Sequence, residues 1–158
     1  MDQVMDVARF IVNYSIEIRK PVSNLKLQKL LYFVQVTFLG QLGVPCYTEP
    51  VVHWRHGPVV ECVYQKYRSY GADSITDQEL EYYEFQFDLD TMSVTTQRRT
   101  YREDIFENYH LNLIRSVVEK YQDVSPWEMV DLTHQEAAWM NTDRNEEITI
   151  DMMKKYYH

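Results

Sequence analysis

Glycine is scarce in this sequence, with four residues in 158. A phosphate-binding loop needs closely spaced glycines whose backbone N–H groups face the ligand. The four glycines are too few and too far apart to form such a loop. The sequence therefore excludes the common nucleotide-binding motifs.

Cysteine is scarcer still, and the two residues, Cys46 and Cys62, form no Cys-x-x-Cys pair. Zinc requires three or four ligands in tetrahedral arrangement, and here only His53 and His56 lie near the cysteines in the sequence. We expect no metal and no cofactor. The cysteines are typical of free thiols in a reducing compartment.

Long apolar runs are missing too. No segment approaches the roughly 20 apolar residues of a membrane-spanning helix, and the first residues, Met1-Asp2-Gln3, do not resemble a secretory signal. We expect one soluble domain spanning residues 1–158, located in the cytoplasm and without contact to a membrane.

Basic residues are absent between Ser69 and Thr96, within a chain of net charge −8. This charge argues against direct binding of nucleic acid, which needs clustered Lys and Arg. The acidic stretch fits either a solvated face or a patch that meets a basic partner. Its acidic residues are Asp73, Asp77, Glu79, Glu81, Glu84, Asp88 and Asp90.

Helical periodicity dominates what is present. It predicts a helix over residues 2–18 and a central amphipathic helix over 25–42, capped by Ser23 or Asn24 and ended by Gly40 and Gly43. The apolar stripe of the central helix predicts that its polar residues lie largely on other faces. The stripe is Leu27, Leu30, Leu31, Val34 and Phe38, and the polar residues are Lys26, Gln28, Lys29 and Gln35.

Other patterns complete a mainly α (α+β) fold. Residues 45–56 indicate a loop with a short extended piece, and Gly57-Pro58 would begin a helix that Gly71 closes. Alternating apolar and polar residues over 82–101 predict one small β-hairpin, with its turn near residues 90–92. Further helices are expected over 105–121, over 126–132 behind a Ser125 cap, in a short turn that Thr133 caps, and over 149–156.

Catalytic arrangements find little support. A Cys62–His134 nucleophilic pair is conceivable, but the amphipathic helix expected around Cys62 predicts a buried, inert thiol. His56 is expected to hydrogen-bond the Gly57-Pro58 turn, and His134 to tie a helix junction or to contact a partner. We predict no catalytic residues and a protein that is not an enzyme.

Three ordered blocks together resemble the Panacea domain family of SocA-like and GepA-like phage-associated proteins. The first runs from Leu25 to Phe33, the second from Trp54 to Val60 with Tyr64, and the third from Leu132 to Trp139. Ala137-Ala138 departs from the family, which often has proline there. The matching residues are Lys26, Leu27, Gln28, Lys29, Leu30, Leu31, Tyr32, Trp54, Gly57, Pro58, Val59, Tyr64, Thr133, His134 and Trp139.

The resemblance implies a binding protein of the antitoxin kind, which neutralises a toxin by direct contact. The alternatives are a phage-encoded, anti-CRISPR-like inhibitor of a host defence nuclease that uses its acidic surface, and an adaptor that delivers a client to a Clp protease. A homodimer is possible. On this interpretation Trp54, Trp127 and Trp139 fill the core. The expected partner-binding residues are Asp77, Glu79, Glu81, Tyr82, Tyr83 and Glu84.

Overall fold

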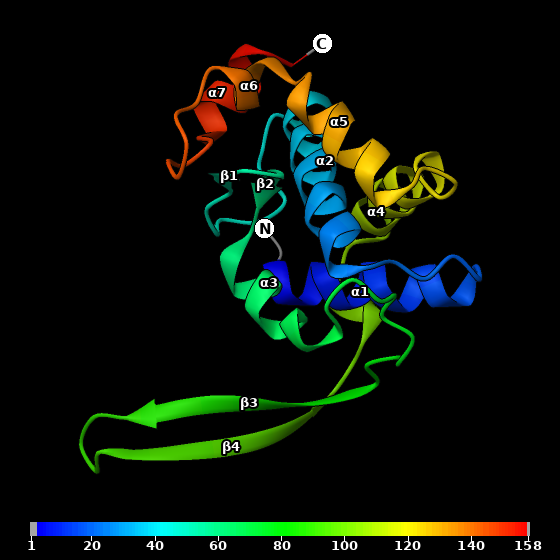
Figure 1. Cartoon of the computed structure of the whole chain (residues 1–158). Coiled ribbons are helices and arrows are strands. Elements are labelled where there is room, and N and C mark those ends of the chain that lie inside the picture. The colour runs from blue at the N-terminus through cyan, green and yellow to red at the C-terminus, as the bar shows by residue number, and fades with distance from the viewer. Residues whose placement is uncertain (1–2, 158) are drawn as a thin grey trace.

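The computed structural model describes residues 3–157, and the seven α-helices within them are arranged around one of their number, the central helix α2 (Figure 1). Two 3-10 turns, Arg68–Tyr70 and Glu103–Ile105, complete the helical segments. The predicted α+β class is confirmed. The helices are α1 (Val4–Glu17), α2 (Asn24–Leu42), α3 (Glu61–Lys66), α4 (Asn108–Lys120), α5 (Pro126–His134), α6 (Ala137–Met140) and α7 (Ile150–Lys155).

The strands form two separate antiparallel hairpins rather than the single one predicted. The first pairs β1 (Val52–Trp54) with β2 (Gly57–Val59), and the second pairs β3 (Glu81–Asp88) with β4 (Ser93–Thr100). The second hairpin and its turn are confirmed. The predicted start of the first helix at Asp2 lies outside the described residues.

Helix α2 is the centre of the fold. Figure 1 shows α1 crossing near its first turn, α4 and α5 along one side, and the β1–β2 hairpin and α7 on the other. Its apolar residues, such as Leu27, Leu31 and Phe38, are fully buried. A helix surrounded on all sides has no solvent face, so its polar residues are enclosed as well.

Side-chain caps fix the ends of two of these helices as predicted. The Ser23 hydroxyl accepts a hydrogen bond from the Lys26 N–H at the start of α2, and Gly43 ends that helix at φ 72°. Ser125 and Glu128 form a capping box at the start of α5. Each cap satisfies backbone N–H groups that the first helical turn leaves free.

The prediction that Gly57-Pro58 begins a helix is wrong. Pro58 lies in strand β2 opposite His53, and helix α3 begins three residues later at Glu61. Proline suits a first helical turn, but it is also tolerated in a two-stranded edge. Hydrogen bonds from Lys29 and Gln28 of α2 to this segment favour the strand over the helical turn.

Three further expectations need correction. Thr133 caps no helix, because it lies inside α5 and its hydroxyl donates to the Val130 carbonyl. Trp127 is 59% exposed rather than part of the core, and Cys62 is exposed rather than buried. Trp54 and Trp139 are half-buried, as expected for large side chains at the core's edge.

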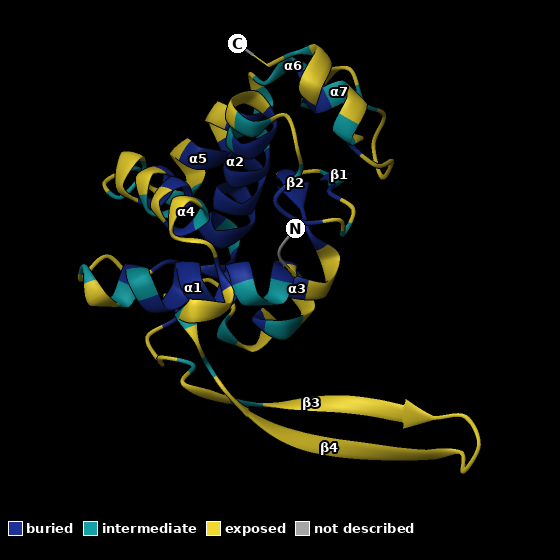
Figure 2. Cartoon of the chain, turned by 180° about the vertical axis from the view of Figure 1, so that it is seen from behind, coloured by how far each residue is buried: buried dark blue, intermediate teal, exposed yellow. Residues whose placement is uncertain are grey.

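The β3–β4 hairpin, which we call the arm, projects away from the helical body. Figure 2 shows both of its strands exposed along nearly their whole length. Alternation along a strand ordinarily marks one buried and one solvated face. Here only the base of one face, at Tyr82, meets the body, so the apolar side chains further along the arm are in water.

None of the described helices is long and apolar enough to cross a membrane. Among the described residues neither cysteine forms a disulfide; Cys46 is buried and Cys62 is exposed.

Candidate protein-binding site

Lys26, Gln28, Lys29 and Gln35, the polar residues predicted off the apolar stripe of α2, are all buried. Lys29 is 0% exposed, and Gln28 and Gln35 are each 1% exposed. Burying such groups is costly unless each has a hydrogen-bond partner. Their partners show what this signature helix does in the structure.

Lys26 binds the end of α4. Its ammonium group donates to the carbonyls of Tyr121, Gln122 and Val124 at 2.7, 3.3 and 2.6 Å. These carbonyls lie at and just after the helix terminus, where the helix itself supplies no partner. Burial lowers the pKa of Lys26. The residue thus joins the start of α2 to the end of α4.

Lys29 holds the β1–β2 hairpin in place. Its Nζ donates to the Pro58 carbonyl at 2.9 Å, and burial lowers its pKa to about 7. Gly57 adopts φ 102°, and a Cβ there would lie 2.6 Å from the Thr133 hydroxyl and 2.9 Å from Lys29 Cε. Glycine is needed here for both backbone conformation and space.

Gln28 and Gln35 likewise hold two other backbone segments in place by hydrogen bonds. Gln28 accepts a hydrogen bond from the Val60 N–H and donates to the Asn24 side chain. Gln35 accepts from the Cys46 N–H and donates to the Tyr47 carbonyl. The signature polar residues therefore orient irregular backbone, which explains why the 57–60 segment is extended rather than helical.

Trp139 lies between two histidine rings. Its ring centroid is 4.0 Å from that of His53 and 4.2 Å from that of His134, with both pairs stacked. Burial lowers the pKa of His134, and a hydrogen bond to the Arg55 backbone acts in the opposite direction. His56 instead packs edge-on against Trp127. The stack joins the third signature block to β1.

The remaining signature residues complete the same core. Tyr32 and Val59 are buried, and Tyr64 packs edge-on against Trp54. Among the residues described, no group of three or more His, Cys, Asp or Glu side chains could hold a metal ion. The signature blocks converge in space. The polar groups of Lys26, Gln28 and Lys29 position backbone, whereas His134 Nε2 and Trp139 Nε1 are buried without a hydrogen-bond partner among the described residues.

The expected partner-binding residues fall into two groups, and the first lies at the base of the arm. The Glu79 carboxylate, 18% exposed, pairs with Lys66 and Arg9 and accepts a hydrogen bond from the Tyr67 hydroxyl at 2.9 Å. Its backbone N–H donates to Asn13. Glu79 anchors the arm to the body and is not a free surface charge.

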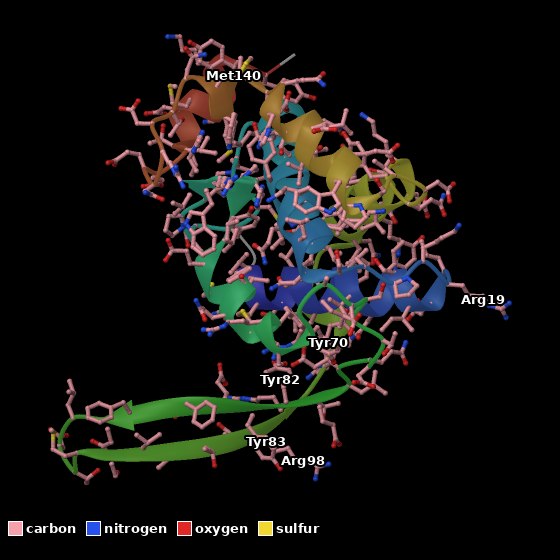
Figure 3. All side chains as sticks on the ribbon, in the orientation of Figure 1. Arg19, Tyr70, Tyr82, Tyr83, Arg98 and Met140 are labelled. Atoms are coloured by element: carbon pink, nitrogen blue, oxygen red, sulfur yellow. The ribbon has the colours of Figure 1, made fainter. Side chains whose placement is uncertain are left out.

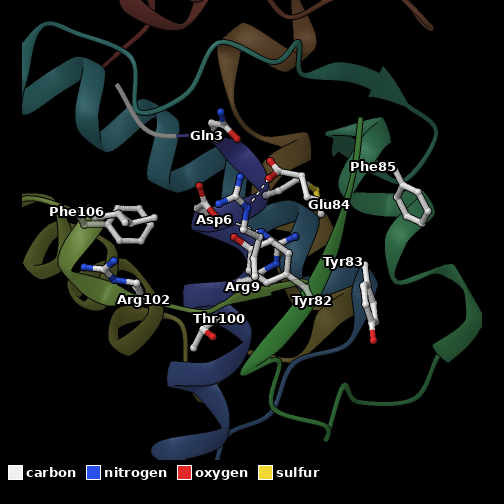
Figure 4. Close-up of a pocket in the computed structure, with 13 residues that line it drawn as sticks. Gln3, Asp6, Arg9, Tyr82, Tyr83, Glu84, Phe85, Thr100, Arg102 and Phe106 are labelled. Atoms are coloured by element: carbon white, nitrogen blue, oxygen red, sulfur yellow. Dashed lines mark hydrogen bonds and ion pairs between the residues drawn. The ribbon is translucent and has the colours of Figure 1, made fainter. Parts of the chain in front are cut away.

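Tyr82 extends this anchor along one face of the arm. The Arg9 guanidinium lies 3.5 Å from the centroid of the Tyr82 ring, as Figure 4 shows. The two residues line a cleft of about 730 Å³ between α1 and the arm, together with Glu84 and Arg99. Every arginine that lines the cleft has a carboxylate partner, so the cleft offers no unpaired cation.

The opposite face of the arm points away from the body. Tyr83 and Phe85 lie on the other side of β3 from Tyr82 in Figure 4, and Figure 3 shows Tyr83 on the projecting part of the chain. Phe85 is 72% exposed. The exposed apolar residues of the arm and its turn are Tyr83, Phe85, Phe87, Leu89, Met92 and Val94.

Charge is divided between the two strands of the arm. Glu81 pairs with Arg98, and Glu84 pairs with Arg99 at 2.8 Å. Further out, Asp88 accepts hydrogen bonds from the backbone of the turn. β3 carries carboxylates and no cation, whereas β4 carries the two arginines and no carboxylate. Asp77, off the arm, accepts a hydrogen bond from the Tyr70 hydroxyl.

The outer half of the arm is not among the expected partner-binding residues. Its alternation predicts a strand, and Phe85 and Phe87 do lie in β3, but the pattern does not indicate that their side chains are exposed. A signal was present in the partner strand, since residues 93–100 contain one apolar residue, Val94. A strand with so little apolar surface cannot cover its neighbour against a core.

A projecting arm with one exposed apolar face is typical of small domains that contact another macromolecule. The chain is a member of the antitoxin SocA-like, Panacea domain family, whose model matches residues 27–140. The match includes the arm and every signature residue except Lys26.

The chain is also similar to antitoxin SocA of Caulobacter vibrioides. The two are 34% identical over 74 residues, which are 47% of this chain and 39% of that protein. The similarity thus spans less than half of the curated relative. No solved structure matches this chain.

Proposed function

We propose that this protein is an antitoxin-like regulator that neutralises a toxin protein by direct binding, without catalysing a reaction. Membership of the antitoxin SocA-like family and the similarity to antitoxin SocA support the antitoxin role. The use of the signature polar residues in holding backbone, rather than in a catalytic pair, agrees with a binding function.

The arm is the observation that carries the proposal. An isolated two-stranded hairpin is at best marginally stable in water, and this one also exposes three aromatic side chains on one face. Covering such a surface with a partner removes apolar area from water, at about 25 cal/mol per Å². The arm would then be the main contact with the toxin.

Neutralisation in cells tests the proposal. The chain is co-expressed with the toxic product of the gene adjacent to its own, and growth and co-purification are measured. We expect growth to be restored and a stable complex to form. A version in which Asn-Gly replaces residues 83–98 keeps Glu79 and Tyr82, so the body should fold and neutralisation should fail.

Two alternative partners predict different results in the same cells. A defence nuclease inhibitor would use the acidic turn, where Asp88 and Asp90 lie without a basic side chain in the strand ends beside them. That function would restore phage growth in the presence of the nuclease. A Clp adaptor would lower the amount of the toxin rather than accumulate it in a complex.

A further inference from the structure

The two edges of the arm are unprotected. β3 and β4 each have eight residues and pair without a bulge from Glu81–Thr100 to Asp88–Ser93. Proteins ordinarily block such edges with proline, lysine, a bulge or a covering segment. The arm contains no proline and no lysine. Its edges can therefore accept another strand.

The backbone groups that face outward can be assigned. Tyr101 donates its N–H to the Leu80 carbonyl at 2.7 Å, one step before the first pair of the arm. Because hydrogen-bonded and non-bonded pairs alternate in an antiparallel ladder, the N–H groups of Tyr83, Phe85 and Phe87 point away from β4. The Thr96 N–H, opposite Phe85, points away from β3 in the same way.

Charge distinguishes the two edges. β3 carries Glu81, Glu84 and Asp88, and β4 carries Arg98 and Arg99, with Glu81 and Glu84 paired to these arginines across the arm. A basic strand beside β4 would face like charges, whereas the same strand beside β3 would share Glu84 and meet Asp88, which has no cation partner opposite it on β4. From Tyr83 to Asp88 the side chains of β3 also alternate between an apolar face and an acidic or polar face.

We propose that the β3 edge binds an extended segment of the toxin in which apolar and basic side chains alternate. Its apolar side chains would extend the Tyr83–Phe85–Phe87 face, and its basic side chains would lie beside Glu84 and Asp88. Main-chain hydrogen bonds supply affinity in this mode and the alternating side chains supply specificity. The inference rests on the proposed antitoxin function.

Proline substitution on each edge tests which edge is used. Phe85 and Thr96 face each other, each with an outward N–H, so Phe85→Pro and Thr96→Pro remove one donor from opposite edges and spare the ladder between the strands. Phe85→Thr keeps the donor and removes the ring. Circular dichroism and thermal melting of each variant check that the helical body is intact.

Binding to the purified toxin is then measured by calorimetry. We expect Phe85→Pro to weaken binding at least roughly tenfold more than Phe85→Thr, the loss of a main-chain hydrogen bond in a dry interface, and Thr96→Pro to bind like the wild type. Equal binding by Phe85→Pro and Phe85→Thr, or loss in Thr96→Pro alone, overturns the assignment to β3.

A charge-matched pair of variants tests the basic character of the partner segment. Glu84→Gln with Asp88→Asn removes two charges from β3, and Asn retains the turn hydrogen bonds. Asp73→Asn with Asp77→Asn removes two charges off the arm. We expect a roughly tenfold loss for the first pair and less than roughly threefold for the second. Equal losses would indicate long-range attraction and overturn local pairing.

The oligomeric state of the chain tests whether the β3 edge binds a toxin or a second copy of this chain. The opposite charges of β3 and β4 would also allow arms of two copies to pair. Light scattering of the wild-type chain should show a monomer, and a dimer that both proline variants abolish would overturn the proposal. If the wild type neutralises no toxin at all, the proposed function fails first, whatever the edges bind.

Discussion

The rings of His53 and Trp139 stack with their centroids 4.0 Å apart, and this contact joins strand β1 to the last signature block. On its other side Trp139 stacks on His134. An indole held between two rings contributes packing that no smaller side chain replaces. Trp139 therefore couples the third signature block to strand β1, beside the second block.

Replacing Trp139 by leucine should destabilise the protein by about 2–3 kcal/mol, since it leaves both imidazole rings without a partner. Trp127→Leu is the matched control, because Trp127 is 59% exposed. We expect it to change the stability by less than about 0.5 kcal/mol. Urea denaturation of both variants measures the difference. Similar losses in the two would contradict the role given to the stack.

Gly57→Ala should lower the stability by more than the addition of one methyl group ordinarily does. The residue has φ 102°, and the added Cβ would collide with Thr133 and Lys29. We expect a loss of at least roughly 2–3 kcal/mol, from backbone strain and from displaced side chains. Gly43→Ala, also at positive φ but with no atom near its Cβ, should cost about 1 kcal/mol. Equal losses would show that the space around Gly57 does not matter.

The sequence predicts an element of this fold well where short-range interactions determine its secondary structure, and poorly where interactions between distant residues do. Caps and helical periodicity located α2, α4 and α5 well, because both are short-range effects. The preference of proline for a first helical turn, which wrongly predicts a helix at Pro58, is an equally local rule. The Lys29 and Gln28 hydrogen bonds that extend this segment join residues about 30 positions apart, and no local pattern contains them.

The burial of Lys29 and the exposure of Phe85 have the same origin, and polarity along one element indicates neither. α2 is enclosed along most of its length, and the outer part of the arm is covered on neither side. The number of neighbours an element has is set by topology, which its own sequence does not encode. The expected partner-binding residues stay a prediction, and the acidic stretch alone does not reveal that Arg98 and Arg99 lie across from it.

The buried Lys29 should make stability depend on pH. Its pKa falls from 10.5 to about 7 on folding because burial disfavours the charged form. Between these values the unfolded chain holds one more proton than the folded chain. The free energy of unfolding should therefore rise with pH, by about 1.4 kcal/mol per unit above pH 7.

Lys29→Met isolates this contribution. Denaturation curves between pH 7 and pH 9 should give a difference between wild type and variant that grows in favour of the wild type as pH rises. The exposed Lys154→Met serves as the control, and its curve should run parallel to that of the wild type. A constant difference between wild type and Lys29→Met would contradict the lowered pKa.

The acidic residues of the arm region should separate into structural and binding groups. Glu79→Gln removes the carboxylate of a mostly buried site; Arg9 keeps Asp6, but Lys66 loses its carboxylate partner, which is costly for a partly buried cation. We expect a loss of about 2–3 kcal/mol. The Glu81–Arg98 pair is exposed on both sides, so Glu81→Gln should cost less than about 0.5 kcal/mol. Thermal melting measures both.

The same variants should differ in toxin binding. Because Glu79 fixes the base of the arm against α1, Glu79→Gln should weaken toxin binding in proportion to its loss of stability. Glu84→Gln with Asp88→Asn should weaken toxin binding while the melting temperature stays unchanged. A Glu79→Gln protein of wild-type stability would show that Tyr82 on Arg9 holds the arm without it.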